Sequence, residues 1–290
     1  MNFACIYIPE ISLQAAVRAE PELQNQAVAV IDGPPSFSKV IALNAKGCKA
    51  GVKLGMTEVQ ATQTAALQIR CRSLAQERAA HAAILDLGFS FSPRVEDRAI
   101  DTIILDLTGL DRLMLSPEAL VNRIVQRSSE LFLEARIALA PNPDVAEVAA
   151  RGFPGITFVA AGEEAQRLAP LPLTVLAPDT EIVSILDSWG IRTLGELARL
   201  PAEDIAARLG QEASHLQMLA RGGSLRPLIP AQASLRFEES LELEYPVALL
   251  EPLTFIFSRL LHGLCARLAA RGFATNELCL RMDLESPPEA

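Results

Sequence analysis

Apolar and polar residues follow two periodicities along the chain, and together these predict an α+β fold. Short continuous or alternating apolar runs indicate strands, whereas apolar residues three or four positions apart indicate helices. The predicted strands of the first part of the chain cover residues 2–8, 27–31, 39–43, 68–72, 92–96, 100–107, 135–140 and 156–160. The predicted helices cover residues 57–66, 76–87, 116–131 and 142–152.

The order of these elements suggests how this part of the chain is organised. Without residues 10–77 it reads strand, helix, strand, strand, helix, strand, which is the split βαβ pattern of ferredoxin-like folds. Its second and third strands form a hairpin, for which we expect a turn at Asp97-Arg98. Residues 10–77 are then an insertion after the first strand.

Residues 170–230 are predicted to form a separate helical unit, because their helical spacing is broken by Gly and Pro without a convincing strand. One helix there ends at Gly190 and the next begins after Thr193. A turn of this kind can present backbone N–H groups to a phosphate.

The last part of the chain predicts two strands around one helix. Alternating apolar residues indicate strands over residues 237–245 and 278–284, and a helical stripe covers residues 249–271 between them. Two strands and one helix rarely form a stable sheet on their own. We therefore expect this last domain to continue beyond residue 290.

The composition is typical of a folded protein with several domains. The chain has 290 residues, half of them hydrophobic, which predicts roughly two or three domains and excludes wholesale disorder. Its longest apolar runs, such as residues 27–31 and 253–257, fall far short of the roughly 20 residues that span a membrane. The N-terminus has no signal-peptide pattern. We expect a cytoplasmic protein with no transmembrane helix and no membrane partner.

Charge and motif content exclude several classes of function. The net charge of −9 argues against a wide electrostatic grip on nucleic acid, so any DNA contact has to be local. The five cysteines and three histidines are scattered without metal-ligand spacing, so no metal site is expected. The sequence argues against a small-molecule α/β enzyme, because the chain has no P-loop, no GxGxxG and no nucleophile beside a base.

Four segments carry a resemblance to a known family: residues 3–17, 42–56, 99–109 and 189–200. The second keeps Asn44, Lys46 and the run from Gly51 to Met56, and the third keeps an acidic hairpin. In order, spacing and residue type the chain resembles the Y-family DNA polymerases of the UmuC type over nearly its whole length.

This resemblance implies a right-hand polymerase architecture of class α+β. It implies a ferredoxin-like palm over residues 1–9 and 78–166 and a small fingers insertion over residues 10–77. It also implies a helical thumb over residues 167–230 and a partial little-finger α+β domain over residues 231–290, whose sheet we expect to be cut short.

The catalytic positions implied by the resemblance have lost most of their acids. The family holds two divalent metals with one carboxylate in the first strand and an adjacent Asp-Glu pair in the hairpin, and these positions read Tyr7, Asp101 and Thr102. Two such ions roughly 4 Å apart repel by about 16 kcal/mol at an effective dielectric near 20, and a phenol and a hydroxyl do not offset this. Asp106, five residues along a predicted strand, should point to the opposite face from Asp101.

The nucleotide-binding positions implied by the resemblance are degenerate as well. The family's fingers Tyr and Arg correspond to Ala45 and Cys48, and its aromatic steric gate corresponds to Ser12. The palm Lys before a Pro corresponds to Phe153, across a shortening of two residues. The resemblance therefore predicts no nucleotide-binding residues, no cofactor and no enzyme activity.

These losses resemble an inactive branch of the family from bacterial mutagenesis cassettes. That resemblance implies an adaptor in DNA-damage tolerance that recruits an error-prone C-family DNA polymerase to damaged DNA for translesion synthesis. Its implied partners are DNA, that polymerase, a RecA-like accessory protein and the sliding clamp. The alternative is an active Y-family translesion polymerase with altered ligands, which would need Mg²⁺ and would lose its activity in Asp101→Ala or Asp106→Ala.

The residues expected to bind DNA come from two places. The family match and the turn described above favour Trp189, Gly190, Ile191, Arg192 and Thr193. Lys46, Lys49 and Lys53 form a positive cluster expected on one short helix, which fits a phosphate contact and a solvated face equally well.

Overall fold

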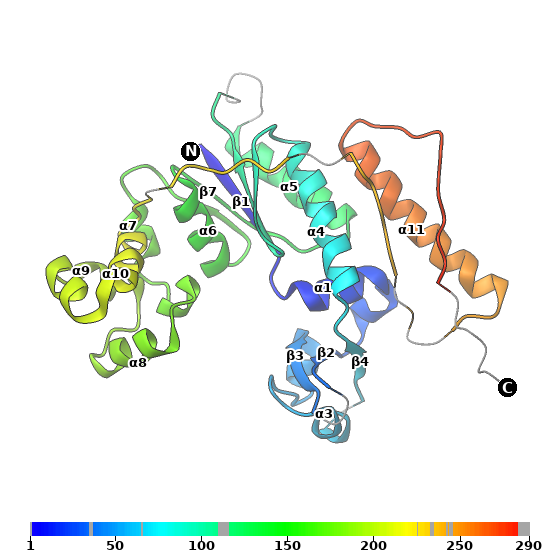
Figure 1. Ribbon diagram of the computed structural model, residues 1–290, viewed down its shortest axis with the longest axis horizontal. Helices are drawn as coiled ribbons and strands as arrows, with labels where there is room; N and C mark the ends of the chain where they lie inside the picture. The colour runs from blue at the N-terminus through cyan, green and yellow to red at the C-terminus, as the bar shows by residue number, and fades with distance from the viewer. Residues whose placement is uncertain are drawn as a thin grey trace.

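The computed structural model describes residues 2–34, 37–64, 66–109, 116–224, 226–232, 235–241, 243 and 246–283. Its central feature is a five-stranded sheet in the order β5-β6-β1-β7-β8 (Figure 1). The strands are β1 (Phe3–Tyr7), β5 (Val95–Ala99), β6 (Thr102–Asp106), β7 (Arg136–Ala140) and β8 (Ile156–Phe158). β1 lies between β6 and β7 and is antiparallel to both, whereas β8 is parallel to β7.

Three helices connect these strands and cover the sheet: α4 (Leu74–Phe89), α5 (Pro117–Glu130) and α6 (Pro143–Gly152). The order β1-α4-β5-β6-α5-β7 is the split βαβ pattern, and α6 with β8 extends it by one parallel strand. The predicted α+β fold class is therefore confirmed. Asn142 begins α6 as expected for an N-cap, since its side chain accepts a hydrogen bond from Val145 N–H at 2.9 Å.

The two faces of the central sheet have different neighbours. Ile6 and Ile103 point to the face covered by α4 and α5, whereas Cys5 and Ile104 point to the face covered by α6. Side chains alternate along a strand, so Tyr7 and Thr102 belong to the α6 face. They are direct partners in the β1–β6 register, which places them side by side at one end of the two strands.

A smaller three-stranded sheet is inserted between β1 and α4, where residues 10–77 were expected to be an insertion. Its order is β3-β2-β4, with β2 (Val28–Asp32), β3 (Lys39–Leu43) and β4 (Gln68–Cys71). The helices of this region are α1 (Ile11–Ala19), η1 (Pro21–Asn25), α2 (Ala45–Lys49) and α3 (Glu58–Thr64). It has small hydrophobic cores of its own on both faces of β2.

A helical unit packs against α6 at one end of the molecule (Figure 1). It consists of α7 (Glu164–Leu168), η2 (Leu173–Leu176), α8 (Thr180–Ser188), α9 (Leu194–Arg199) and α10 (Ala202–Ala220). Leu168, Leu194 and Leu197 are fully buried in the core that this unit shares with α6. The end of α6 is therefore held between the central sheet and the helical unit.

The chain returns across the central sheet after α10. Arg226 bonds to Asp144 of α6 and to Glu96 of β5, both at 2.6 Å. The backbone N–H of Ala231 then donates to the carbonyl of Val95 at 2.7 Å. This connection passes along the edge strand β5 to the opposite end of the molecule.

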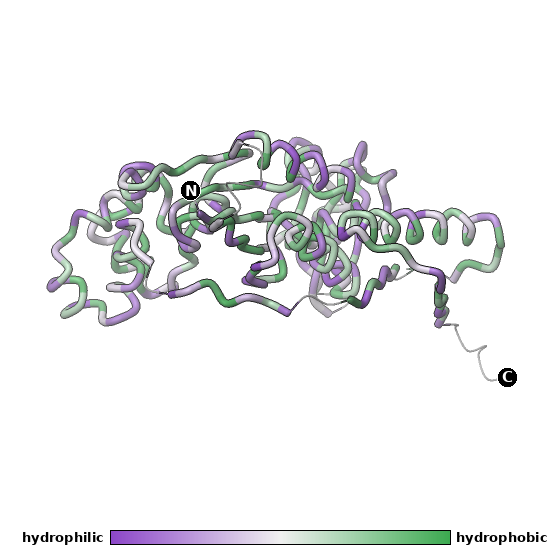
Figure 2. Tube along the Cα trace, turned by 90° about the horizontal axis from the view of Figure 1, so that it is seen from above, coloured by the Kyte–Doolittle hydropathy of each residue, from purple (hydrophilic) through white to green (hydrophobic). Residues whose placement is uncertain are grey.

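The last described helix, α11 (Leu250–Ala270), lies at that opposite end, and in Figure 2 it projects from the rest of the chain. The strands predicted on either side of it are wrong for the described residues, because residues 237–241, 243 and 278–283 form no strand. No described segment runs beside them as a hydrogen-bonded partner, and a single strand is not stable alone. Residues 242, 244, 245 and 284 of those predictions lie outside the described residues.

A chain of buried ion pairs attaches α11 to the rest of the protein. Arg267 of α11 bonds to Asp86 of α4 at 2.7 Å and to Glu239 at 3.2 Å. Glu239 also pairs with Arg18 of α1 at 2.8 Å, and Asp86 with Arg271 at 3.0 Å. The side chains of all five are at most 11% exposed.

By length and composition, α11 is the one described helix that could cross a membrane. The expectation of no transmembrane helix rested on uninterrupted apolar runs, whereas α11 combines apolar residues with a few charges, so that expectation stays a prediction. A single helix of this kind is weak evidence for a membrane span. Its Arg267 is buried against Asp86, an interaction with protein rather than lipid.

Two helical glycines, one in the helical unit and one in α11, test how closely these helices pack. A Cβ at Gly195 of α9 would lie 2.8 Å from the Cβ and 3.0 Å from the carbonyl oxygen of Ala169, so Gly195→Ala should destabilise the fold by about 1–3 kcal/mol. A Cβ at Gly263 of α11 meets nothing nearer than 3.5 Å, so Gly263→Ala should stabilise it by up to about 1 kcal/mol through helix propensity. Urea unfolding measures both, and equal effects would contradict the close approach of α9 to Ala169.

Candidate active site

The three positions expected to be catalytic do come together at one end of the central sheet. Tyr7 and Thr102 are paired on β1 and β6, and Asp101 lies in the turn just before β6. The Thr102 hydroxyl donates to Asp101 Oδ1 at 2.7 Å. The turn is at Ile100–Asp101, so the predicted turn at Asp97-Arg98 is wrong.

A bulge explains the displaced turn. The register between β5 and β6 shifts between Asp97 and Ala99, and this shift carries β5 past Asp97 and Arg98 before the chain turns. The predicted pair therefore lies within the strand. Asp101 is therefore a turn residue, and the alternation of side chains along a strand does not determine the direction of its side chain.

A single arginine contacts all three positions. Arg151, in the last turn of α6, donates from Nη2 to Asp101 Oδ1 at 3.0 Å and to the Thr102 hydroxyl at 2.8 Å. Its Nη1 lies 3.5 Å from Asp101 Oδ2, and its guanidinium carbon lies 4.8 Å from the centre of the Tyr7 ring. The only carboxylate among the three positions is thus paired with a cation of the chain itself.

Further charges extend this pair along α6. Glu147, one helical turn before Arg151, accepts from Arg151 Nε at 3.3 Å and from Arg98 Nε at 2.8 Å. Burial lowers the pKa of Arg151, but Asp101 and Glu147 more than offset this and raise it overall. Arg151 is therefore a permanent cation at this end of the sheet.

The neutral groups of the site stay protonated. Burial, followed by the charge of Asp101, raises the pKa of Tyr7, while Arg151 acts in the opposite direction. Burial also raises the pKa of the Cys5 thiol well above its usual value, on the same sheet face. Neither side chain supplies a negative charge near neutral pH.

The residues present do not fit the two divalent metals that the fold family implies. Two such ions need several carboxylates to offset their repulsion. Here the donor set is one carboxylate already bound to a guanidinium, one phenol and one hydroxyl. Among the described residues there is no group of three or more His, Cys, Asp and Glu side chains that could hold a metal ion.

Asp106 does not complete the site. The prediction that it points to the opposite face is wrong, because Asp106 lies four residues after Thr102 on β6 and hence on the same face. That spacing puts it about 13 Å from Thr102 along the strand. Its carboxylate is held there by Arg94 at 2.7 Å and by the N–H of Thr108 at 2.9 Å.

The expected nucleotide-binding positions lie in the inserted region and carry no positive charge. Ser12 is half-buried on α1, and Ala45 and Cys48 are exposed on α2. Asn44 fixes the start of α2, because its side-chain oxygen accepts from Gly47 N–H at 2.9 Å and from Val28 N–H at 3.1 Å.

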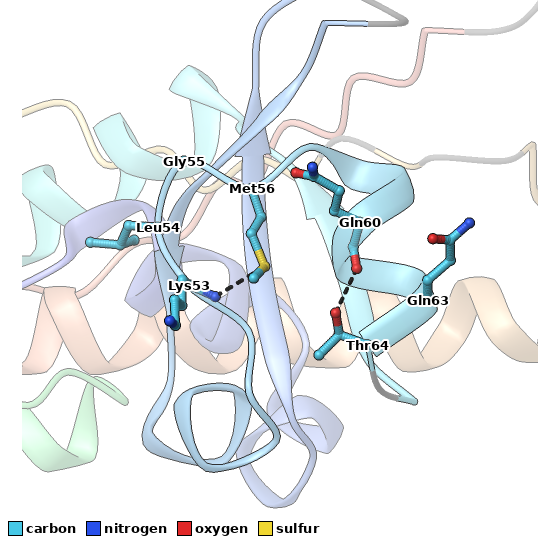
Figure 3. Close-up of a pocket in the computed structure, with 7 residues that line it drawn as sticks. All are labelled: Lys53, Leu54, Gly55, Met56, Gln60, Gln63 and Thr64. Atoms are coloured by element: carbon cyan, nitrogen blue, oxygen red, sulfur yellow. Dashed lines mark hydrogen bonds between the residues drawn. The ribbon is translucent and has the colours of Figure 1, made fainter.

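The lysine cluster is divided between a helix and a loop. Lys46 and Lys49 are exposed on α2, and Lys53 follows in the loop after it, so the expectation of one short helix is wrong. Lys46 Nζ donates to the carbonyl of Asn25 at 2.8 Å. Lys53 lines an open pocket of about 550 Å³, where its backbone N–H contacts Met56 Sδ at 3.4 Å (Figure 3).

The turn expected to bind DNA in the helical unit has its amides occupied. The N–H groups of Arg192 and Thr193 both donate to Glu196 Oε2, at 2.8 and 2.9 Å, within the capping box of α9. These bonds lower the pKa of Glu196. A phosphate at these two amides would have to displace a carboxylate, so the mechanism predicted for this turn does not hold.

The side chains of the same turn remain available for the predicted DNA contact. Trp189 is 42% exposed and ends α8, and Gly190 follows it with φ 77°. Arg192 is 76% exposed and pairs with Asp187 at 2.9 Å. Ile191 packs instead against the core of the unit. DNA contact at these positions stays a prediction.

Sequence reasoning missed the residue that dominates the site. Arg151 is 50 residues from Asp101, and the only local signal was its i,i+4 spacing from Glu147 on a predicted helix. Phe153, compared above with the family's palm Lys, lies with its ring 5.1 Å from the Arg167 guanidinium. Arg151 lies two residues before Phe153, and this offset is the same as the two-residue shortening in the comparison with the family.

A sequence model described as the impB/mucB/samB family matches residues 6–151, half of the chain. The chain belongs to this family. The match begins in β1 and ends at Arg151, so it contains Tyr7, Asp101, Thr102, Glu147 and Arg151. It agrees with the Y-family resemblance derived from the sequence.

Relatives of two names are similar to this family member. DNA polymerase IV of Dehalococcoides mccartyi (strain CBDB1) is 34% identical over 231 residues, which are 77% of this chain and 58% of the relative. Protein ImuB of Caulobacter vibrioides (strain NA1000 / CB15N) is 29% identical over 198 residues, 68% of this chain and 43% of the relative. The chain thus spans about half the length of these curated relatives.

Solved structures of the Y family share the fold. DinB from Sulfolobus solfataricus matches with a TM-score of 0.66 and 20% identity, over 79% of this chain and 69% of that one. An insertion ternary complex of Dbh DNA polymerase matches with a TM-score of 0.67 and 19% identity, over the same shares of the two chains. These likenesses establish the right-hand fold expected above.

The expectation that this chain is not an enzyme is contradicted by these comparisons. Several relatives that match 77% of the chain at 32–34% identity are named DNA polymerase IV. The expectation rested on the degenerate metal-ligand positions together with the degenerate nucleotide-binding positions inferred from the resemblance. Missing ligands alone were too narrow a basis for it.

Tyr7 offers a direct test of this charge arrangement. The chain has two tyrosines, so Tyr245→Phe leaves Tyr7 as the only phenol. We expect Tyr7 to ionise above its ordinary pKa of about 10, and Arg151→Ala to raise that pKa further by removing the nearby cation. Ultraviolet absorbance of the phenolate against pH measures both. The stability that depends on neutral Tyr7 is present below the unfolded pKa and is lost as pH rises through the folded one.

The matched control is Arg167→Ala, which removes one positive charge beside Phe153 instead of Tyr7. It should leave the Tyr7 titration unchanged. A Tyr7 pKa that falls or stays constant in Arg151→Ala would contradict the position of the guanidinium over the ring.

Proposed function

We propose that this chain is the polymerase part of a Y-family translesion DNA polymerase with altered metal ligands. The observation that carries the proposal is the 34% identity to a relative named DNA polymerase IV over 77% of the chain. The fold adds support, because it is shared with a ternary complex of Dbh DNA polymerase. In this proposal the protein extends primer–template DNA with nucleoside triphosphates in the cytoplasm.

The domain division proposed with this function follows the resemblance. Residues 1–9 and 78–166 would be the palm, 10–77 the fingers, 167–230 the thumb and 231–290 part of the little finger. This assignment is supported by the central sheet, which joins β1 to β5–β8 while the region between forms a second sheet.

The proposed DNA contact is confined to a small surface, because the chain carries a net charge of −9. Its candidate contacts are the exposed side chains of Trp189 and Arg192, together with Lys49 and Lys53. Trp189 offers an aromatic face on which a base or sugar can stack, and Arg192 offers a cation for a phosphate.

At the palm, the chain's own residues fix the charge that a primer end would meet. Arg151 neutralises Asp101, and the Thr102 hydroxyl orients that carboxylate by donating to Oδ1. Tyr7 remains a neutral phenol beside them. In this proposal the 3′ end of a primer would approach a site whose carboxylate is already paired.

Primer extension tests the proposed function. The purified chain, with a primer–template and all four nucleotides in Mg²⁺ or Mn²⁺, should add template-directed nucleotides, and Asp101→Asn should slow this by about 100-fold or more. Asp204→Asn, which removes an exposed carboxylate of α10 in the helical unit, is the matched control and should extend at the wild-type rate. If the wild-type chain adds no nucleotides above the level of Asp101→Asn, this proposal fails.

A second candidate function is an adaptor in DNA-damage tolerance and induced mutagenesis. It is supported by the 29% identity to Protein ImuB over 68% of the chain. In that role the protein would bring an error-prone C-family DNA polymerase, an ImuA-type RecA-like protein and the sliding clamp to damaged DNA.

Size-exclusion chromatography of mixed purified proteins tests the adaptor role. We expect the chain to elute together with the C-family polymerase or with the ImuA-type protein at micromolar concentration, the range in which transient partners associate. Separate elution of both of these partners from this chain would contradict it. The result is independent of primer extension, so the two candidate functions are tested separately.

A further inference from the structure

Arg151 lies at the centre of the palm site, the site formed by Tyr7, Asp101 and Thr102, and its guanidinium contacts four side chains. Two of its nitrogens face the oxygens of Asp101, at 3.0 and 3.5 Å, and one of them also contacts the Thr102 hydroxyl at 2.8 Å. Its Nε faces Glu147 at 3.3 Å, and its plane lies near the Tyr7 ring. Three of these neighbours are the positions at which the sequence suggested metal ligands.

The backbone that carries this guanidinium is held firmly in place. Arg136 of β7 donates from Nη1 to the carbonyl of Arg151 at 3.4 Å. The next residue, Gly152, lies so close to the helical unit that a Cβ there would be 2.5 Å from Leu171 Cδ1. The end of α6 is therefore fixed between the sheet and the helical unit. This position places the Arg151 guanidinium beside Asp101.

The charges of the site balance only while Arg151 is present. Asp101 has Arg151 as its ion-pair partner, with side chains 21% and 26% exposed. Glu147 has a second partner in Arg98, at 2.8 Å. Loss of the Arg151 charge would thus leave Glu147 paired with Arg98, and Asp101 without its ion-pair partner, beside two hydroxyl groups.

We infer that Arg151 is the resident cation of this site, and that in the free chain, without DNA and nucleotide, a divalent ion binds at Asp101 only when the guanidinium is removed. The carboxylate oxygens that an ion would need are those that Arg151 contacts. A guanidinium and a divalent ion close to one carboxylate also repel each other. This inference goes beyond the proposed function and rests on contacts within the chain alone.

The consequence is a metal affinity that is governed by one side chain. A neighbouring unit charge changes an ionic equilibrium by about 10- to 1000-fold at contact distance. We therefore expect Arg151→Gln to bind Mn²⁺ at least about 10-fold more tightly than the wild-type chain. Arg151→Lys keeps the positive charge and should stay within about threefold of wild type.

Electron paramagnetic resonance of free Mn²⁺, titrated with the full chain in the absence of DNA and nucleotide, measures these affinities. The double variant Arg151→Gln with Asp101→Asn should lose the gain, because the freed carboxylate is gone. Arg167→Ala removes an equal charge that lies near Phe153 rather than Asp101, and it should leave Mn²⁺ binding as in wild type. Circular dichroism of each variant confirms that it is folded.

Each outcome decides the inference. Tighter Mn²⁺ binding in Arg151→Gln that disappears in the double variant supports it. Equal affinity of Arg151→Gln and wild type overturns it, and so does a gain that survives Asp101→Asn, since the ion would then bind elsewhere. If Arg151→Gln does not fold, Arg151→Met in the same assay replaces it. Primer extension has no part in this assay, so its failure leaves the inference standing.

Discussion

The ion pair between Arg151 and Asp101 is the interaction on which the palm site depends. The pairing of β1 with β6 brings Tyr7, Asp101 and Thr102 to one end of the central sheet, where a partly buried carboxylate needs a compensating cation. That cation comes from α6, which reaches the site because it covers the same sheet face and is clamped by the helical unit. The register of two strands and the seating of one helix thus determine the charge of the site together.

The family and the charge of the site give different kinds of information. The family match and the shared fold identify a Y-family chain with relatives named DNA polymerase IV and ImuB. The described residues show a guanidinium in contact with the positions of the expected ligands. A shared fold permits more than one use of the same place, so activity has to be measured at the site itself.

Much of the fold could be predicted from local sequence patterns. Short apolar runs predicted β1 and β7, and the helices predicted to begin at Ser116 and Asn142 do begin there, because both side chains cap the N-terminus of α5 or α6. The turn at Ile100–Asp101 could not be predicted, because it depends on a bulge in the pairing of β5 with β6. The strands expected around α11 failed for a related reason, since strand formation needs a partner as well as a pattern.

The candidate site was predictable only in part. The resemblance located Tyr7, Asp101 and Thr102, which the structure brings together. It missed Arg151, because an ion pair across 50 residues leaves no periodic signal in the sequence. The occupied amides of Arg192 and Thr193 were hidden in the same way, since the acceptor is a carboxylate three or four residues further along.

The buried ion pairs of α11 have a mechanical consequence. Asp86 and Glu239 are each shared by two arginines, so Arg18, Arg267 and Arg271 are linked into one continuous series of charges. Breaking one contact leaves a neighbouring charge uncompensated in a poorly solvated place, which is strongly unfavourable. Partial detachment is therefore unfavourable, and α11 should separate from α1 and α4 cooperatively, with all of these ion pairs breaking together.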